Sequence, residues 1–172
     1  MPERALALEK RSVTDQDLPV LFQIYADSRA EEMAESGWDA TQVEQFLSWQ
    51  FETQRQAYLQ MFPEASFELV LLDGEPVGRL YVDRSEREIH VIDIALLTEY
   101  RRRGIGARLF APLLEESERA GLPITLYVEQ NNPILPWYRR MGFQEIDENG
   151  PYLHMKRRPT EATTQTQERE DA

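Results

Sequence analysis

The sequence predicts one mixed α/β domain in which seven strands and four helices follow in the order βαα-βββ-α-β-α-ββ. The length of 172 residues suits a single domain with one hydrophobic core. An apolar fraction of 41 % is ordinary for a globular protein. Segments in which polar and apolar residues alternate, typical of strands, are interleaved with segments whose apolar residues recur three and four apart, typical of helices. These observations favour a domain over residues 1–158.

The first half of the chain is predicted to contain one strand, two helices and a β-hairpin. Two motifs resemble capping boxes, Thr14-x-x-Asp17 and Thr41-x-x-Glu44, and each is expected to open a helix. Asp73-Gly74 is a tight-turn signal between two β-rich runs. The expected elements are a strand over 5–10, helices over 14–29 and 41–62, and strands over 67–72 and 77–82.

The second half begins with a long strand over residues 89–97 that is apolar except for Asp93, which suggests a central strand covered on both faces. A helix is expected over 104–120. Asn132-Pro133 is interpreted as a second helix start, with asparagine as the N-cap and proline in the first turn. The other expected elements are a strand over 124–128, a helix over 132–141, and strands over 143–146 and 152–155. Residues 159–172 have almost nothing to bury, and we expect a disordered tail.

Composition excludes several classes of function. The chain has no cysteine, which removes disulfides, thiolate nucleophiles and cysteine-ligated metals. Histidine and the acids show no metal-ligand spacing, so we expect no metal. The net charge of −12 argues against nonspecific binding to nucleic acid. Because the sequence has no apolar run long enough for a membrane span and no signal-peptide pattern, we expect a cytoplasmic protein without a membrane partner.

The glycine-bearing segment from Arg101 to Gly106 has the chemistry of an anion site. It follows the apolar strand and opens a helix, whose first backbone N–H groups and positive dipole end attract anions. Glycine at 104 and 106 would let phosphate oxygens approach the backbone, and three arginines add positive charge. A dinucleotide fingerprint would need a third glycine where Leu109 stands. Taken alone, two glycines at a helix start also fit an ordinary tight turn or another nucleotide-binding α/β domain.

The sequence around this segment resembles the GCN5-related N-acetyltransferase (GNAT) superfamily. That family's cofactor motif is Q/R-x-x-G-x-G/A directly after a hydrophobic strand, and Arg101-x-x-Gly104-x-Gly106 satisfies it. A second family signature, a strand, an asparagine and a short helix that carries a tyrosine and ends in Gly-Phe, matches Asn132, Tyr138 and the following residues. The resemblance covers residues 5–156. It departs from the pattern at Thr98, where the family usually has proline.

The resemblance implies a central, mixed, mostly antiparallel sheet that splays between the fourth and fifth strands, with the pantetheine arm of acetyl-CoA in the gap. It implies that the acetyl group passes to a primary amine by direct attack, and the alternative is an acyl-CoA-binding module of the same fold without catalysis. Tyr138 would protonate the departing thiolate, and the backbone N–H of Leu96 would polarise the thioester carbonyl. The residues implied in acetyl-CoA binding are Ile94, Ala95, Leu96, Arg101, Arg102, Arg103, Gly104, Ile105, Gly106, Ala107, Asn132 and Tyr138.

Two of these residues have a second, purely structural interpretation. Asn132 could act only as an N-cap, and Tyr138 could be only a core aromatic residue. The general base stays open, because family members that acetylate protein N-termini often carry glutamate where this chain has Tyr127. The candidates for it are Glu88, His90, Asp93, Glu129 or a water molecule.

The acceptor is expected to be a small-molecule or peptide amine. It would bind between the two N-terminal helices and the late hairpin over 147–152. Nine acids and two arginines lie between residues 12 and 60, together with Trp38, and this composition favours a cationic acceptor. The sequence is compatible with a monomer or a homodimer.

Overall fold

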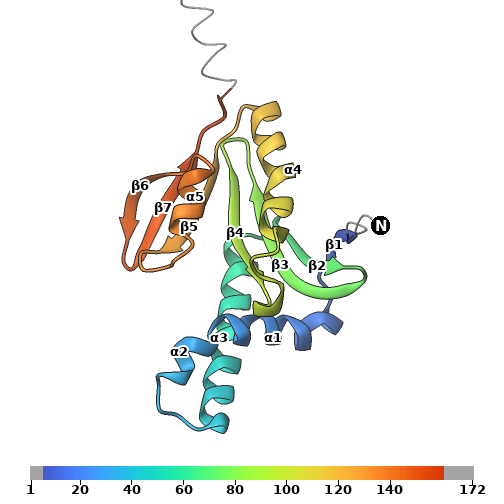
Figure 1. The fold of residues 1–172 in the computed structure, drawn as a ribbon, viewed down its shortest axis with the longest axis vertical. Helices are drawn as coiled ribbons and strands as arrows, with labels where there is room; N and C mark the ends of the chain where they lie inside the picture. The colour runs from blue at the N-terminus through green and yellow to red at the C-terminus, as the bar shows by residue number, and fades with distance from the viewer. Residues whose placement is uncertain (1–5, 161–172) are drawn as a thin grey trace, which may run out of the picture. The chain divides into compact units, whose positions relative to one another are not determined.

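The computed structural model describes residues 6–160. Its seven strands form one sheet in the order β1-β2-β3-β4-β5-β7-β6 (Figure 1). β4 and β5 are parallel, whereas the β1–β2, β5–β7 and β6–β7 pairs are antiparallel. The strands are β1 Leu8–Ser12, β2 Ser66–Leu72, β3 Glu75–Arg84, β4 Ile89–Leu96, β5 Ile124–Glu129, β6 Gln144–Asn149 and β7 Tyr152–Arg157. The predicted mixed, mostly antiparallel sheet is therefore confirmed.

The described part contains five α-helices and two short 3-10 helices. These are η1 Asp15–Asp17, α1 Leu18–Ser28, α2 Ala30–Ala34, α3 Ala40–Met61, η2 Thr98–Tyr100, α4 Ile105–Ala120 and α5 Leu135–Arg140. The short helix α2 was not predicted, because five residues are too few to establish an apolar period. The first predicted strand lies slightly later than expected, at Leu8–Ser12.

The predicted start of α3 is wrong in detail. The capping box of α3 is formed by Asp39 and Gln42, whose side chains each accept from the backbone N–H of the other, so Thr41 and Glu44 lie inside the helix. Asp39 satisfies the same orphan N–H groups two residues earlier, so the helix begins there. By contrast, Thr14 and Asp17 do form the predicted capping box, around η1 at the entry to α1.

The described residues fall into two compact units. Residues 6–81 and 93–103 form the first unit, and residues 82–92 and 104–160 form the second. β3 and β4 each contribute to both units. Thr160 still donates to Glu118 of α4, so ordered contacts continue two residues past the predicted domain boundary. The rest of the predicted tail, 161–172, lies outside the described residues.

The first unit packs α1 and α3 together through an apolar core. Leu21, Ile24 and Tyr25 of α1 meet Phe51 of α3 and Leu69 of β2. Ala95 and Leu97, at the end of β4, pack against the same core. The predicted tight turn is also here, with positive φ at Asp73 (49°) and Gly74 (84°), as a two-residue hairpin turn requires. The core therefore holds the end of β4 against the two helices.

The second unit is built on β5, β7 and β6 and the N-terminal part of β4. β4 pairs with β5 from Ile89 to Val91. Phe110 of α4 is completely buried and makes edge-to-face contacts with Trp137, Tyr138 and Phe143, at ring-centroid distances of 5.5, 6.0 and 6.2 Å. This aromatic cluster fixes α5 on α4. The expected splay concerns the far ends of β4 and β5, which belong to different units, and it stays a prediction.

Candidate active site

The loop that leads from β4 to α4 is anchored within the first unit by Arg101 and Thr98. Arg101 donates through Nε to the carbonyl oxygen of Leu96 at 2.9 Å. The carboxylate of Asp27 accepts from both the backbone N–H and the hydroxyl of Thr98, each at 2.8 Å, and lies 3.7 Å from the Arg101 guanidinium. These contacts give Arg101 a structural role in the loop, and its predicted contact with the cofactor stays a prediction.

The same contacts account for threonine at the position where the family usually has proline. Proline has no backbone N–H, so it could not make either hydrogen bond that Thr98 makes to Asp27. The carboxylate that receives these bonds sits near the end of α1, within Leu18–Ser28. Threonine at position 98, which departs from the family pattern, is therefore paired with Asp27 in this chain.

The middle of the loop adopts left-handed backbone conformations. Gly104 has φ of 79°, and a Cβ there would meet nothing within 4 Å, so its glycine is required by the backbone angle and not by crowding. Arg102 also has a positive φ, 62°, which is uncommon outside glycine. The guanidinium of Arg103 lies 5.5 Å from the centre of the Tyr100 ring. Arg102 and Arg103 are both exposed and available to an anion in solvent.

The first turn of α4 lies in the second unit. Its first intrahelical bond runs from the N–H of Arg108 to the carbonyl of Gly104, so the N–H groups of residues 105–107 precede the helical ladder. A Cβ on Gly106 would lie 3.3 Å from the Trp137 ring. Gly106 was predicted to let a phosphate approach the backbone, and in the structure it also leaves room for α5 to pack against α4.

At the end of β4, Asp93 is committed to an ion pair. Its carboxylate accepts from Arg79 Nε at 2.5 Å, and Arg79 also donates to Gln54 of α3 at 2.9 Å. Arg79 is 4 % exposed. A carboxylate that neutralises a buried guanidinium is poorly suited to collect a substrate proton, so this contact argues against Asp93 as the general base. The next residues, Ile94, Ala95 and Leu96, are half-buried.

Tyr138 is a buried member of the aromatic cluster of the second unit, 5 % exposed. This burial fits the core interpretation, and it does not test the proton-donor role. Asn132 is not the N-cap of α5, because that helix begins at Leu135. Its side-chain oxygen instead accepts from the backbone N–H of Ile134 at 3.0 Å, which closes a turn before the helix. The N-cap of α5 is Ile134, two residues after the predicted asparagine cap.

A row of aromatic side chains crosses β4, β5 and β7 in the second unit. His90 Nδ1 lies 2.9 Å from the Thr125 hydroxyl, and burial lowers the pKa of His90. The Tyr127 ring lies edge-on to His90 and is stacked on His154, with centroids 4.5 Å apart and planes inclined by 16°. Tyr127 itself is 47 % exposed, so the row reaches solvent.

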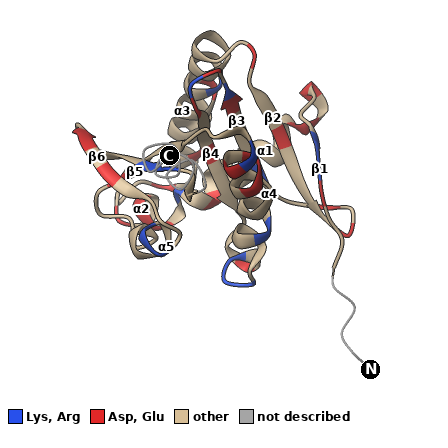
Figure 2. Ribbon diagram, turned by 90° about the horizontal axis from the view of Figure 1, so that it is seen from above, with Lys and Arg blue, Asp and Glu red and all other residues tan. Residues whose placement is uncertain are grey.

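His154 is the residue of this row that the sequence analysis missed. Its Nδ1 lies 3.5 Å from a carboxylate oxygen of Asp147, on the neighbouring strand β6. β6 is strongly acidic, with Glu145, Asp147 and Glu148 among its six residues (Figure 2). The pattern that could have revealed the pair is its position in the last hairpin, where the two antiparallel strands place residue 147 opposite residue 154.

Within the described residues, no group of three or more histidine, aspartate or glutamate side chains is arranged to hold a metal ion. Over the same part of the chain, no helix is both long and apolar enough to cross a bilayer. Neither observation bears on the acetyl-CoA hypothesis, which needs only an anion site and a thioester-binding strand.

Comparisons with known proteins agree with the motifs. The sequence profile of the acetyltransferase (GNAT) family matches residues 27–143. An N-alpha-acetyltransferase of Sulfurisphaera tokodaii is 30 % identical over 99 residues, which are 48 % of this chain and 59 % of that protein. An uncharacterized N-acetyltransferase of Methanocaldococcus jannaschii is 27 % identical over 161 residues, which are 86 % of this chain and 66 % of that one. The chain thus spans less than two thirds of each relative.

Solved structures share the fold. The crystal structure of PaiA N-acetyltransferase from Thermoplasma acidophilum in complex with coenzyme A superposes with a TM-score of 0.66 and 18 % identity, over 88 % of this chain and 99 % of that one. A likeness at this level of identity establishes the fold alone. The family profile covers most of the chain, including both motifs that carry the resemblance. The chain belongs to the acetyltransferase (GNAT) family.

Proposed function

We propose that the protein transfers the acetyl group of acetyl-CoA to a primary amine by direct attack of the amine on the thioester. The observation that carries this proposal is the strand–loop–helix segment from Leu96 to Gly106, within a chain that matches the family profile over residues 27–143. In that segment, Arg101 and Thr98 hold the loop in place, while Arg102 and Arg103 are exposed.

For the cofactor, the proposed diphosphate ligands are the backbone N–H groups of Ile105, Gly106 and Ala107, together with the guanidinium groups of Arg102 and Arg103. Orphan N–H groups and the helix dipole favour an anion at this helix start. Guanidinium groups can add bidentate hydrogen bonds to phosphate oxygens. By family resemblance, the pantetheine arm would pair with the backbone of residues 94–96 and reach Asn132.

For the chemistry, Tyr138 is proposed to protonate the coenzyme A thiolate as the tetrahedral intermediate collapses. A thiolate leaves more readily when a hydroxyl group donates a proton to it. The backbone N–H of Leu96 is proposed to stabilise the developing oxyanion, because a fixed donor strengthens its hydrogen bond as negative charge builds on the carbonyl oxygen. Both roles are carried over from the family by position.

For the proton that the amine must lose, we propose His154 as the acceptor, oriented by Asp147. A carboxylate beside one imidazole nitrogen holds the ring in place and stabilises the imidazolium that forms when the other nitrogen takes a proton. The 3.5 Å separation of Nδ1 and the carboxylate oxygen and the stacking on Tyr127 support this pairing. Asp93 is not proposed, because Arg79 holds its carboxylate.

The acceptor is proposed to be a cationic small-molecule or peptide amine. The hairpin expected to border the acceptor carries the acids of β6, and within the described residues Asp147 and Glu148 form no ion pair with an arginine. Acidic residues attract a positively charged amine from solution and raise its local concentration. The acidic excess of residues 12–60 would act in the same direction.

The proposal is tested in two steps on the purified chain. Thermal unfolding with acetyl-CoA, ATP and NAD identifies the cofactor, because a ligand that binds the folded state raises its stability by mass action. Acetyl-CoA and a set of cationic and neutral amines are then incubated with the protein, and products are detected by mass. We expect a melting shift with acetyl-CoA alone and acetylation of cationic amines.

Each step can fail in a distinct way. A melting shift with ATP or NAD but none with acetyl-CoA would contradict the cofactor assignment. Equal rates for neutral and cationic amines of the same size would contradict the acceptor class while leaving the transfer reaction in place. Within the site, His154→Gln should lower kcat/KM at neutral pH, whereas His90→Gln, which alters the other histidine of the row, should leave it nearly unchanged.

A further inference from the structure

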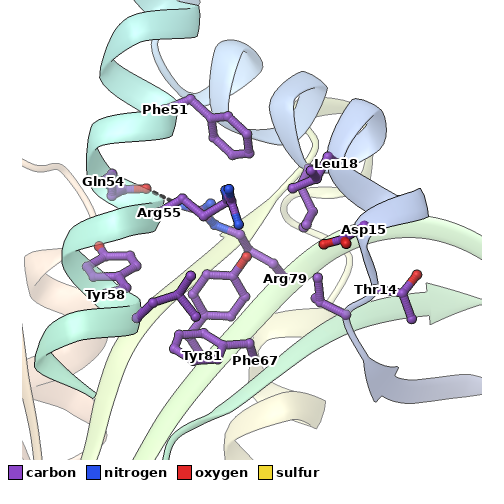
Figure 3. Close-up of a pocket in the computed structure, with 13 residues that line it drawn as sticks. Thr14, Asp15, Leu18, Phe51, Gln54, Arg55, Tyr58, Phe67, Arg79 and Tyr81 are labelled. Atoms are coloured by element: carbon purple, nitrogen blue, oxygen red, sulfur yellow. Dashed lines mark hydrogen bonds between the residues drawn. The ribbon is translucent and has the colours of Figure 1, made fainter. Parts of the chain in front are cut away.

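The first unit contains a cavity of about 230 Å³ between α1, α3 and the strands β2 and β3 (Figure 3). Its walls are mostly apolar and aromatic. Leu18 and Leu21 come from α1, Phe51 and Tyr58 from α3, and Phe67 and Tyr81 from the strands. Leu59, at the edge of the cavity, is 44 % exposed, so the space opens to solvent.

Two guanidinium groups line this apolar space. Arg79 rises from β3 beneath the cavity, with its Cζ atom 4.9 Å from the centre of the Tyr81 ring. Arg55 extends from α3 toward the same space, as Figure 3 shows. Arg79 is held by hydrogen bonds to Asp93 and Gln54, which both belong to the first unit. The cavity therefore combines a hydrophobic interior with two guanidinium groups, each of which is paired with a carboxylate.

Arg55 is held less firmly than Arg79. Arg55 donates through Nε and one terminal nitrogen to Glu52, at 3.0 and 2.7 Å, on the exposed surface of α3. These hydrogen bonds lower the pKa of Glu52 to about 2. The Arg55 side chain is 31 % exposed and that of Glu52 50 %, so the pair lies at the cavity mouth in water, where such pairs contribute little. A buried ligand anion could compete for this guanidinium.

The size of the cavity limits the ligand. An engineered apolar cavity of about 150 Å³ in another protein takes up benzene, so about 230 Å³ suits one aromatic ring with a short polar extension. Aromatic walls favour a ring through edge-to-face contacts. A guanidinium favours a carboxylate, which it can bind through two parallel hydrogen bonds. Asp15, which is exposed and lines the cavity near Thr14, acts electrostatically on Arg55 as Glu52 does, so a ligand carboxylate must compete with both acids for this guanidinium.

We propose that this cavity is a binding site for a small monocyclic aromatic carboxylate, with its ring between α1 and α3 and its carboxylate on Arg55. The site is separate from the predicted acetyl-CoA residues, none of which lines it. It lies between α1 and α3, the two helices expected to border the acceptor, but away from the segment that connects them. Phe51 is eleven residues into α3 from Ala40, which is about 16 Å along the helix. No family motif assigns a ligand here.

The ligand class is tested by titrating phenylacetate, benzylamine and acetate into the full chain by calorimetry. Phenylacetate has both the ring and the carboxylate, benzylamine keeps the ring with the opposite charge, and acetate keeps only the carboxylate. We expect one saturable site for phenylacetate and affinities at least about tenfold weaker for the other two, since one charge-assisted hydrogen bond is worth roughly a factor of ten or more. Equal or tighter binding of benzylamine would overturn the proposal.

Three variants locate the site. Arg55→Gln should weaken phenylacetate binding by about tenfold, and Glu52→Gln should strengthen it because the competing carboxylate is removed. Arg119→Gln, on the exposed face of α4, removes one positive charge elsewhere and should leave the affinity unchanged. If Arg55→Gln and Arg119→Gln bind phenylacetate alike, the assignment of the carboxylate to Arg55 is wrong.

A filling variant tests the cavity itself. Leu18→Phe places a larger side chain in the space and should abolish phenylacetate binding, and its melting temperature shows whether the chain still folds. Should that variant unfold, a crystal grown with phenylacetate decides the question by the presence or absence of the ring beside Phe51 and Tyr58. Acetyl-CoA binding measured on the same samples keeps a failure here distinct from a failure of the proposed transfer reaction.

Discussion

Replacing Asp93 with asparagine tests whether this acid is structural, as the ion pair with Arg79 indicates. Arg79 is 4 % exposed, and among the side chains that it contacts by hydrogen bond only Asp93 carries a charge that balances its own. Removing one partner of a buried ion pair costs about 3–5 kcal/mol, because the other charge stays buried without compensation. Asparagine keeps an oxygen acceptor, Gln54 still accepts from Arg79, and the Tyr81 ring lies 4.9 Å from the guanidinium, where it can stabilise the charge. We therefore expect Asp93→Asn to lower the free energy of unfolding by the smaller of these amounts, about 3 kcal/mol.

The measurement is urea unfolding of the wild type, Asp93→Asn and the double variant Arg79→Met/Asp93→Asn. The double variant removes the buried charge as well, so it should recover part of the lost stability. Glu86→Gln, which neutralises an exposed acid in the loop before β4, should change the free energy of unfolding by less than about 0.5 kcal/mol. A loss below about 1 kcal/mol for Asp93→Asn, or a double variant less stable than the single one, would refute this account of the pair.

Three further predictions concern other residues. Gly78→Ala places a Cβ against the Ala95 carbonyl oxygen and 2.8 Å from Leu96 Cδ2. We expect urea unfolding to show a destabilisation of about 1–3 kcal/mol, and the acetylation assay to show a higher KM for acetyl-CoA. Unchanged values would show that β3 and β4 can separate there. Tyr138→Phe should lower kcat about a hundredfold or more in the acetylation assay, and full activity would exclude the proton-donor role. Hydrogen bonds from Arg11 and then Thr14 lower the pKa of Asp17 in the folded state, so the ionised carboxylate contributes its full stability above the unfolded pKa of about 4 and loses it at lower pH. Asp17→Asn should therefore be less stable than wild type above about pH 5 and equally stable in acid. A difference in the free energy of unfolding that stays constant with pH would contradict this.

Much of the fold could be predicted from local pattern. The two-residue turn at Asp73 and Gly74, the capping box at Thr14 and Asp17 and the succession of strands and helices along the chain rest on short-range chemistry that the sequence displays. The start of α3 was missed because Asp39-x-x-Gln42 and Thr41-x-x-Glu44 are both plausible boxes, two residues apart, and only the backbone geometry selects the first. The start of α5 was missed because Asn132 forms a turn instead of a cap.

The candidate site was less predictable, because its side chains depend on long-range partners. The ion pair of Asp93 joins two strands and is not visible in the sequence pattern, which therefore left Asp93 among the possible general bases. The pairing of His154 with Asp147 needs the register of the β6–β7 hairpin, which includes an irregularity between Glu145 and Asp147. Without that shift, alternation alone would assign these side chains to the wrong partners.

The cofactor motif itself divides into residues with different tasks. Arg101 is the first position of the motif, yet its guanidinium is directed to the Leu96 carbonyl and toward Asp27, both within the first unit. Arg102 and Gly104 adopt left-handed angles that turn the chain into α4. The motif therefore contains residues that shape the loop as well as exposed arginines that are proposed to bind the cofactor. Because Thr98 and Arg101 meet at one carboxylate, Asp27 belongs functionally to the motif although it lies seventy-one residues before Thr98, and no pattern confined to the loop could include it.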